Sequence, residues 1–209
     1  MRRSGATLLV GIVAAISGCT GSLLDSKIPA PTVYVLSAAP AVDDSGPAAP
    51  IDLAVSLATA APGLNTERLA VIHEARRLDY FLNAQWGAAL PEVAQNLVVA
   101  SLQNQHLFRS VMSEQVRVNA SYWMELEVRD FQAEYAREGE APTIRVTFVG
   151  SIIRLKDRKL LGIAPATATV VASDNRLGAV VSAFESAAQQ AALALGQRTN
   201  TLIADAGAQ

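Results

Sequence analysis

The strongest constraint on the fold is a series of alternating apolar and polar residues in the second half of the chain. From Tyr122 to Val128, and again within Thr143–Leu155, apolar residues occupy every second position. Because successive side chains of a strand point to opposite faces, these runs predict strands with one face in a core. Polar turns at Arg137–Pro142 and Lys156–Lys159 link them to a third strand, Leu160–Ala172. The pattern therefore predicts an antiparallel meander of three strands.

The alternation changes phase within the first of these strands. Apolar residues hold the even positions from Tyr122 to Val128, whereas they continue at odd positions from Phe131 to Tyr135. A side-chain period of two allows no such slip without an extra residue, so we predict a β-bulge near Arg129 to Phe131. Pro165 predicts an edge or bulged position for the third strand, because proline has no backbone N–H to donate.

Three more strands are predicted before the meander. Runs typical of strands cover Thr32–Ser37, Ile51–Leu57 and Arg68–Glu74, and the proline-rich segment Ala38–Pro50 predicts a loop. We expect the aromatic stretch Asp79–Gly87 to be irregular.

Two amphipathic helices are predicted from apolar residues at helical spacing. The first carries Pro91 in its first turn, where proline is tolerated, and ends near Asn104 to His106. The second is rich in alanine and is capped by Ser173 or Asp174. Together the elements predict an α+β fold: a two-layer sandwich of a mostly antiparallel sheet, with two long helices packed on one face. The apolar stripes are Leu90, Ala94, Leu97, Val98 and Leu102, with Gln95 off the stripe, and then Leu177, Val181, Phe184, Ala188, Ala191, Leu195 and Leu202.

Composition excludes several classes of protein. With 51% hydrophobic and 17% charged residues, the 209-residue chain can bury a core rather than remain disordered. Its formal net charge of −2 gives no basic surplus for phosphates, so we expect no nucleic-acid partner. A single cysteine excludes an internal disulfide and a cysteine zinc cluster. Neither an internal repeat nor a second domain is apparent.

Residues 1–18 are typical of a bacterial export signal. A basic pair, Arg2–Arg3, precedes an apolar run from Ala6 to Ile16 and an exit of small residues. The tetrapeptide Ile16–Cys19 (ISGC) resembles the lipobox, in which the signal is removed before the cysteine and the thiol takes a diacylglycerol. We therefore predict a lipoprotein signal peptide at residues 1–18. The one predicted modification is a diacylglycerol with an N-acyl chain on Cys19, and no other cofactor is expected. A buried free cysteine is the alternative.

The residues after Cys19 indicate where the protein resides. Residues 19–31 are small and polar with prolines, which is typical of a tether, and the predicted domain follows at 32–205. The residue after Cys19 is Thr20, whereas an aspartate at this position would resemble an inner-membrane retention signal. By that analogy we expect the periplasmic leaflet of the outer membrane, with acyl chains contributing about 0.8 kcal/mol per buried methylene.

No catalytic or metal-binding pattern is recognisable in the sequence. A glycine-rich phosphate loop, a dinucleotide fingerprint and a nucleophile elbow are all missing, so we predict no catalytic residues and no enzyme activity. His73 and His106 are expected at a strand end and a helix end rather than in one site. Glu125, Glu127 and Arg129 share one strand face, where solvated cross-strand charge pairing is a more ordinary role than acid–base catalysis.

Two segments are candidate contact surfaces. Arg76–Arg77 either binds lipid phosphates or forms surface pairs with neighbouring carboxylates. Tyr80, Phe81 and Trp86 have two interpretations, an aromatic patch that binds a partner protein or a plug at the end of the core. We retain these three aromatic residues as candidate partner-binding residues.

Motifs along the chain together resemble the ABC-type transport auxiliary lipoprotein family. Each is short, but their order and spacing match over essentially the whole chain after Cys19. They are Tyr34–Pro40 (YVLSAAP), the run from Arg77 through Tyr80 and Trp86 to Leu90-Pro91, Val128–Ala133 (VRDFQA), and Ala183-Phe184 in the alanine-rich helix.

The resemblance implies a non-catalytic periplasmic component of an MCE-type ABC transport system, which moves phospholipids or other hydrophobic molecules between membranes. It implies an MCE-domain substrate-binding protein and its ABC permease and ATPase as partners, and a ring of identical subunits. A structural envelope-assembly lipoprotein without a transport role is the alternative. A third hypothesis, an envelope hydrolase, is disfavoured by the missing motifs.

Overall fold

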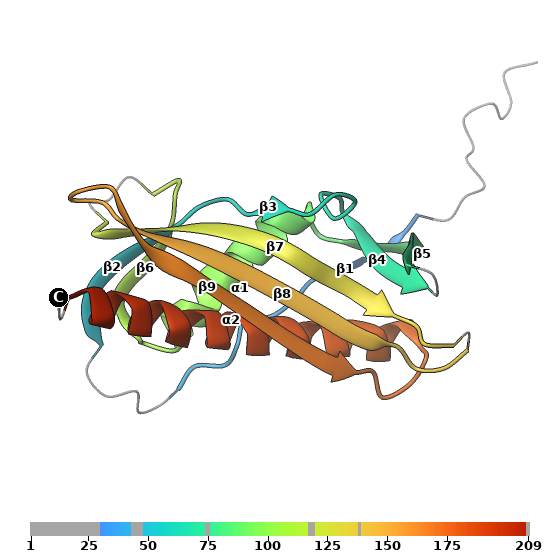
Figure 1. Cartoon of the computed structure of the whole chain (residues 1–209). Helices are drawn as coiled ribbons and strands as arrows, with labels where there is room; N and C mark the ends of the chain where they lie inside the picture. Colours follow the sequence, from blue (N-terminus) through green and yellow to red (C-terminus); the bar gives the residue numbers. More distant parts are fainter. Residues whose placement is uncertain (1–29, 43–47, 74–75, 117–119, 138, 208–209) are drawn as a thin grey trace, which may run out of the picture. The chain divides into compact units, whose positions relative to one another are not determined.

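The computed structural model describes residues 30–42, 48–73, 76–116, 120–137 and 139–207. The predicted signal peptide, Cys19 and nearly all of the tether lie outside these residues, and those assignments stay predictions. Residues 31–209 form one compact unit of sheet and helices (Figure 1).

The described residues of this unit form a sheet of nine strands. Six of them lie in the order β1-β5-β4-β7-β2-β6, while β3 and β8 pair with β7, and β9 pairs with β8. The strands are β1 Thr32–Tyr34, β2 Ala49–Val55, β3 Thr59–Ala60, β4 Arg68–His73, β5 Arg77–Trp86, β6 Phe108–Ser113, β7 Tyr122–Glu134, β8 Thr143–Arg154 and β9 Lys159–Val171.

Strand β7 organises the sheet, because other strands pair along both of its edges. On one edge β8 pairs antiparallel along the strand, and β9 continues the sheet antiparallel to β8. On the other edge β2, β3 and β4 pair in parallel with successive segments of β7, around Met124, Val128 and Ala133. The predicted meander and the mostly antiparallel sheet are confirmed.

The predicted bulge and the predicted edge strand are both present. The register of β7 against β8 shifts between Val128 and Asp130, which leaves Arg129 as the extra residue. Pro165 lies in β9, which pairs with β8 alone among the described strands and so forms an edge.

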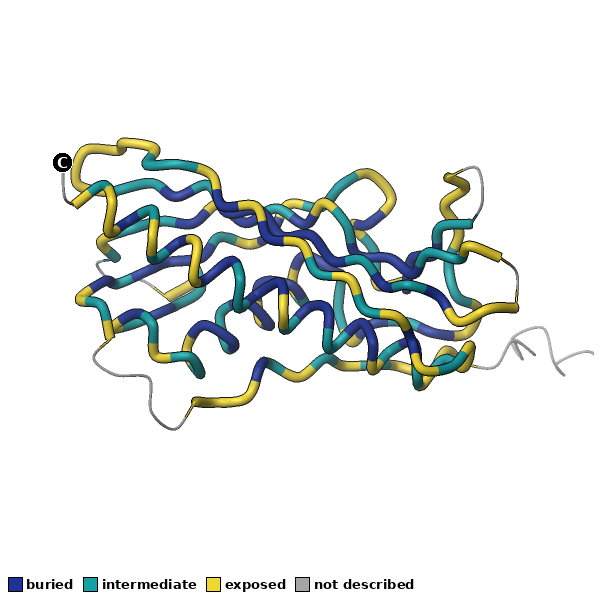
Figure 2. The backbone as a smooth tube through the Cα atoms, turned by 60° about the horizontal axis from the view of Figure 1, so that its bottom comes forward, coloured by how far each residue is buried: buried dark blue, intermediate teal, exposed yellow. Residues whose placement is uncertain are grey.

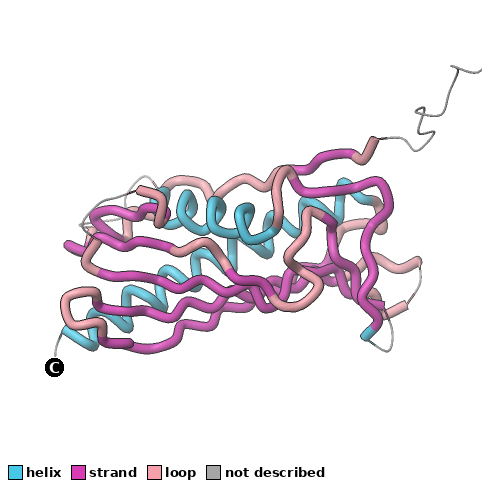
Figure 3. Tube along the Cα trace, turned by 90° about the horizontal axis from the view of Figure 1, so that it is seen from above, coloured by secondary structure: helices cyan, strands magenta, loops and turns pink. Residues whose placement is uncertain are grey.

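Two helices, α1 (Leu90–Asn104) and α2 (Leu177–Gly207), pack on one face of the sheet and contact each other (Figures 1 and 3). Between the layers lie fully buried aromatic residues, including Trp86, Phe131, Phe148 and Phe184. Figure 2 shows buried residues concentrated where helices and central strands face each other. The two-layer α+β sandwich is therefore confirmed.

Helix α1 follows the prediction apart from one side chain. Pro91 lies in its first turn, and the predicted apolar stripe is buried. Gln95 was expected off that stripe, yet it is 3% exposed because its Nε2 donates to the Val55 carbonyl oxygen at 3.0 Å. A buried amide is tolerated when it is hydrogen-bonded in this way.

The predicted cap of α2 is wrong. Residues 173–176 form bends, and the helix begins only at Leu177. The Asp174 carboxylate instead pairs with the guanidinium of Arg176 within these bends. A side chain this far before the first helical residue cannot satisfy the free N–H groups of the first turn.

Three strand predictions also need correction. Most of the stretch Asp79–Gly87 belongs to β5, whose first half pairs with β4 and whose end pairs with β1, and it is irregular only between Tyr80 and Gln85, where the register against β4 shifts. A left-handed Asn83 (φ 54°) interrupts its alternation and explains why the pattern was hidden. Strands β3 and β6 were not predicted at all. Strand β1 ends early, at Tyr34, and the chain then meets α2, where the Ser37 N–H donates to the Glu185 carboxylate at 2.7 Å.

Candidate functional site

The bulge in β7 gives the sheet a polar strip on the face opposite the helices. Beyond the extra residue Arg129, Phe131 points into the core and is 1% exposed. By alternation, Asp130, Gln132 and Glu134 point to the other face. The phase slip thus decides which residues of this strand line a surface and which line the core.

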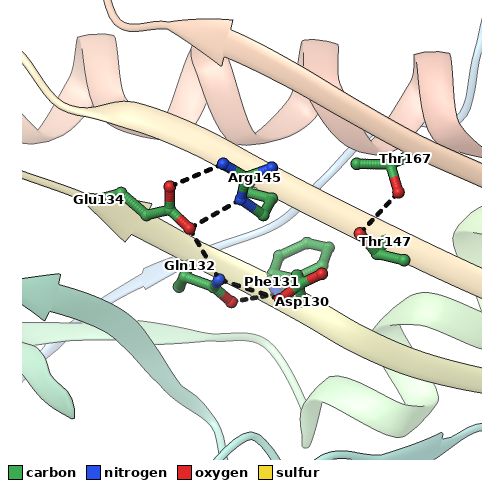
Figure 4. Close-up of polar contacts among 7 residues, drawn as sticks. All are labelled: Asp130, Phe131, Gln132, Glu134, Arg145, Thr147 and Thr167. Carbon is green, nitrogen blue, oxygen red and sulfur yellow. Dashed lines mark hydrogen bonds and ion pairs between the residues drawn. The ribbon is translucent and has the colours of Figure 1, made fainter. Parts of the chain in front are cut away.

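A hydrogen-bond network joins these polar side chains (Figure 4). Arg145 of β8 donates two hydrogen bonds to the Glu134 carboxylate, at 2.8 and 3.1 Å. Gln132 Nε2 donates to Asp130 at 3.3 Å and to Glu134 at 3.2 Å, while its Oε1 accepts from the Phe131 N–H at 2.8 Å. The Arg145 guanidinium lowers the pKa of Glu134, because it stabilises the charged carboxylate.

A second ion pair lies beside this network. Arg129 donates two hydrogen bonds to the Glu127 carboxylate, both at 3.0 Å, and both side chains are largely exposed. Glu125 makes no ion pair among the described residues. The structure therefore favours charge pairing over acid–base work, although the pair forms within one strand rather than across strands.

A loop of residues 61–64 forms one wall above the strip. The Ala61 N–H donates to a β7 carbonyl oxygen at 2.9 Å, which fixes the start of the loop. Gly63 has a φ of 86°, a conformation that glycine adopts readily, and its carbonyl oxygen accepts from the Tyr80 hydroxyl at 2.9 Å. The Arg68 guanidinium lies 3.7 Å from the centre of the Tyr80 ring. Tyr80 thus braces the wall.

Loop and strands enclose a cleft of about 590 Å³, which we call the charged cleft. Arg76, in the left-handed conformation (φ 59°) just before β5, adds an exposed guanidinium to its lining. The lining combines apolar side chains, which include Pro62, Ile72 and Leu78, with charged ones, which include Arg76, Asp130 and Arg145.

A second depression of about 450 Å³, the apolar hollow, shares His73 and Tyr135 with the charged cleft. The rings of these two residues are stacked at 5.8 Å, and the Tyr135 hydroxyl donates to Asn175 at 2.7 Å. Burial raises the pKa of Tyr135. Phe81, which is partly buried, and Leu82, which is 86% exposed, line the hollow.

The three candidate aromatic residues have different surroundings. Trp86 is 1% exposed, and its ring meets the edges of Phe131 (5.7 Å) and Phe184 (5.3 Å) in T-shaped contacts. Because no surface of Trp86 is left for a partner, its candidate contact role is corrected to a core role. Tyr80 braces the cleft wall and Phe81 faces the apolar hollow, so their role as partner contacts stays a prediction.

The histidines and the arginine pair are not gathered into one site. His73 ends β4, whereas His106 follows α1. Arg76 lines the charged cleft and Arg77 does not, and neither forms an ion pair with a carboxylate in the described ranges.

Sequence analysis did not assemble the charged cleft. Its polar residues come from strands whose register cannot be read from local pattern alone. One signal was available, because a strand that buries Phe131 after the bulge must turn Asp130 and Gln132 outward. Leu82 was missed because its exposure depends on the irregular backbone at Asn83.

The described residues lack two further features. They contain no cluster of histidine, cysteine, aspartate and glutamate that is arranged to hold a metal ion. Nor does that part of the chain include a helix with the length and apolar character needed to cross a bilayer.

Fold and cleft together define an α+β domain that presents a concave, charged surface beside an exposed apolar residue. The family model for the ABC-type transport auxiliary lipoprotein component matches residues 34–196. The chain belongs to this family, and it is therefore an auxiliary lipoprotein component of ABC-type transport.

Comparison with solved structures supports the same fold. The crystal structure of protein XCC0632 from Xanthomonas campestris has a TM-score of 0.76 at 19% identity, and the match covers 85% of this chain and 99% of that one. A crystal structure described only as an uncharacterized protein gives a TM-score of 0.59 at 13% identity, with the same coverage. No curated protein matches the sequence. At these identities the likeness concerns the fold alone.

Proposed function

We propose that this protein is a non-catalytic auxiliary component of an MCE-type ABC transport system that moves phospholipids or other hydrophobic molecules between membranes. The observation that carries the proposal is the family match over residues 34–196, directly after a lipobox and a short tether. In this proposal a diacylglycerol and an N-acyl chain on Cys19 hold the protein at the periplasmic leaflet of the outer membrane. Acyl chains supply enough buried methylenes for stable attachment.

The proposed partners are an MCE-domain substrate-binding protein and, through it, the permease and ATPase. Phe81 and Leu82 supply the proposed contact, because they place apolar surface at the rim of the apolar hollow. Aromatic side chains seated in a pocket are common anchors of protein interfaces, and Leu82 would add apolar contact area beside Phe81. In this proposal identical subunits form a ring at the membrane, and each subunit would repeat the contact with the MCE-domain protein.

A fractionation experiment tests the anchor. We expect the wild-type protein in outer-membrane fractions and the Cys19→Ala variant in the soluble periplasm. Persistence of that variant in the outer membrane would show that something other than the predicted lipid holds the protein there.

Co-purification tests the partner. Wild-type protein isolated from intact cells after crosslinking should bring down an MCE-domain protein and its ATPase. Leu82→Asp should weaken this recovery, because it places a charge in an apolar contact. The matched control is Leu160→Asp, since Leu160 is also exposed (53%) but lies on the edge strand β9. Recovery of envelope-assembly proteins without any transporter subunit would favour the structural alternative.

A further inference from the structure

We propose that the charged cleft binds a zwitterionic phospholipid headgroup of the phosphoethanolamine class, with the ammonium at Asp130 and the phosphate at Arg76. This rests on the proposed function only for the source of the ligand, which would be the membrane lipid that the transport system handles. The residues that line the cleft, and the ion pairs that some of them already make, argue for the headgroup class independently of any partner.

Asp130 is the carboxylate in the cleft that has capacity for a cation. Gln132 is 8% exposed and donates to one Asp130 oxygen at 3.3 Å, which orients the carboxylate. In the described ranges no arginine, lysine or histidine lies within ion-pair distance of it. By contrast, Glu134 already receives two hydrogen bonds from Arg145. A primary ammonium offers three donors and fits such an oriented acceptor.

Arg76 is the matching cation. The other guanidiniums of the cleft, Arg129 and Arg145, each donate two hydrogen bonds to a carboxylate of this chain. Arg76 forms no ion pair with the described carboxylates, and it lines the cleft from the turn before β5. A planar guanidinium is well suited to a phosphate because it can donate two parallel hydrogen bonds. A ligand that carries both charges would give Asp130 and Arg76 each a partner of opposite charge, which neither has among the described residues.

The apolar side chains of the cleft favour a lipid over a free amine or free phosphate. Pro62, Ile72 and Leu78 form a surface on which glycerol and the first methylenes of acyl chains can pack. The cleft volume of about 590 Å³ exceeds what a phosphate ion alone would fill and lies within the roughly 300–1,000 Å³ of small-molecule sites.

The test is calorimetric titration of the full chain, kept soluble by Cys19→Ala. The probes are dihexanoyl-phosphatidylethanolamine and dihexanoyl-phosphatidylglycerol, both as monomers, together with glycerophosphoethanolamine and inorganic phosphate. We expect the phosphatidylethanolamine to bind about tenfold more tightly than the phosphatidylglycerol, since one charge-assisted hydrogen bond is at stake. Binding should weaken with added salt, because the cleft is open to solvent.

Two variants and two matched controls assign the charges. Asp130→Asn keeps an acceptor for Gln132 but loses the charge, so it should remove the tenfold preference. Arg76→Gln, in an exposed turn, should weaken the binding of both lipids. The matched controls are Glu125→Gln, on the same strand as Asp130, and Arg77→Gln, next to Arg76. Both should leave the affinity for each lipid unchanged.

Equal affinity for the two lipids in the parent protein would overturn the headgroup assignment, as would a preference that survives Asp130→Asn. Phosphate binding as tight as lipid binding would replace the lipid by a free-phosphate site. If the lipid preference holds while no transporter subunit co-purifies, the cleft assignment stands and the proposed function fails. If transporter subunits co-purify while the lipid preference is absent, the proposed function stands and the cleft assignment fails.

Discussion

The Trp86→Ala substitution separates a core role from a contact role for the aromatic segment of β5. Trp86 is 1% exposed and meets Phe131 and Phe184 in T-shaped contacts at 5.7 and 5.3 Å. Truncation removes the indole from both contacts and leaves a cavity between sheet and helix α2. The substitution should therefore act on stability before it acts on any partner.

The expected loss can be estimated in two ways. A buried tryptophan removes about 200 Å² from water, which at ~25 cal/mol per Å² corresponds to roughly 5 kcal/mol as an upper bound. Measured truncations of core aromatic residues cost about 3–5 kcal/mol. We therefore expect a loss of about 4 kcal/mol, a large part of the roughly 5–15 kcal/mol of a typical domain. For a chain of this length, Tm should fall by roughly 8–16 °C.

Thermal and urea unfolding, followed by near-ultraviolet circular dichroism, measures this loss. Leu82→Ala is the control on the same strand. Because Leu82 is 86% exposed, its truncation should change stability by less than about 0.5 kcal/mol. A Trp86→Ala protein that melts with the parent yet no longer recovers the transporter would refute the core assignment and restore Trp86 as a contact residue.

Two further predictions concern α2 and the cleft network. Gly196→Ala should lower the free energy of unfolding by about 1 kcal/mol, measured by urea unfolding. The new methyl group meets the buried Leu102, and this overpacking exceeds the gain in helix propensity. Gly178→Ala, which has open space around it, is the control and should be neutral or stabilising. Glu134→Gln should cost about 1 kcal/mol at most at pH 7, since the pair with Arg145 is partly exposed. Because the folded pKa of Glu134 is lowered, its contribution is present above the unfolded pKa of about 4.3 and is lost as the pH falls below it, so the two proteins should converge in stability in acid.

Local periodicity explains which parts of the fold were predictable. The strands of the meander, the bulge and the apolar stripes of both helices each leave a pattern within a short stretch of sequence. The bulge is the clearest case, because Val128 and Phe131 can both be buried only if one residue between them is extra. Such features require no knowledge of what the element pairs with.

The remaining features depend on long-range pairing. Strand β5 is held by β4 and β1, and β2 to β4 are ordered along β7 by parallel pairing with segments more than 60 residues away. Gln95 is buried because the Val55 carbonyl oxygen accepts its amide, which no helical pattern reveals. Likewise, the meeting of Arg145 with Glu134 depends on the exact register of β8 against β7.

The bulge couples the core to the cleft. Asp130 and Phe131 are consecutive residues of one strand, so each can have its present position only if the other faces the opposite way. If Arg129 were paired regularly with β8 instead of bulging out, the segment beyond it would be out of phase, with Asp130 facing the core and Phe131 facing the cleft. A buried unpaired carboxylate costs several kcal/mol, and an exposed phenylalanine would remove a contact with both Trp86 and Phe184. The same backbone irregularity that completes the aromatic core therefore also supplies the oriented carboxylate of the cleft.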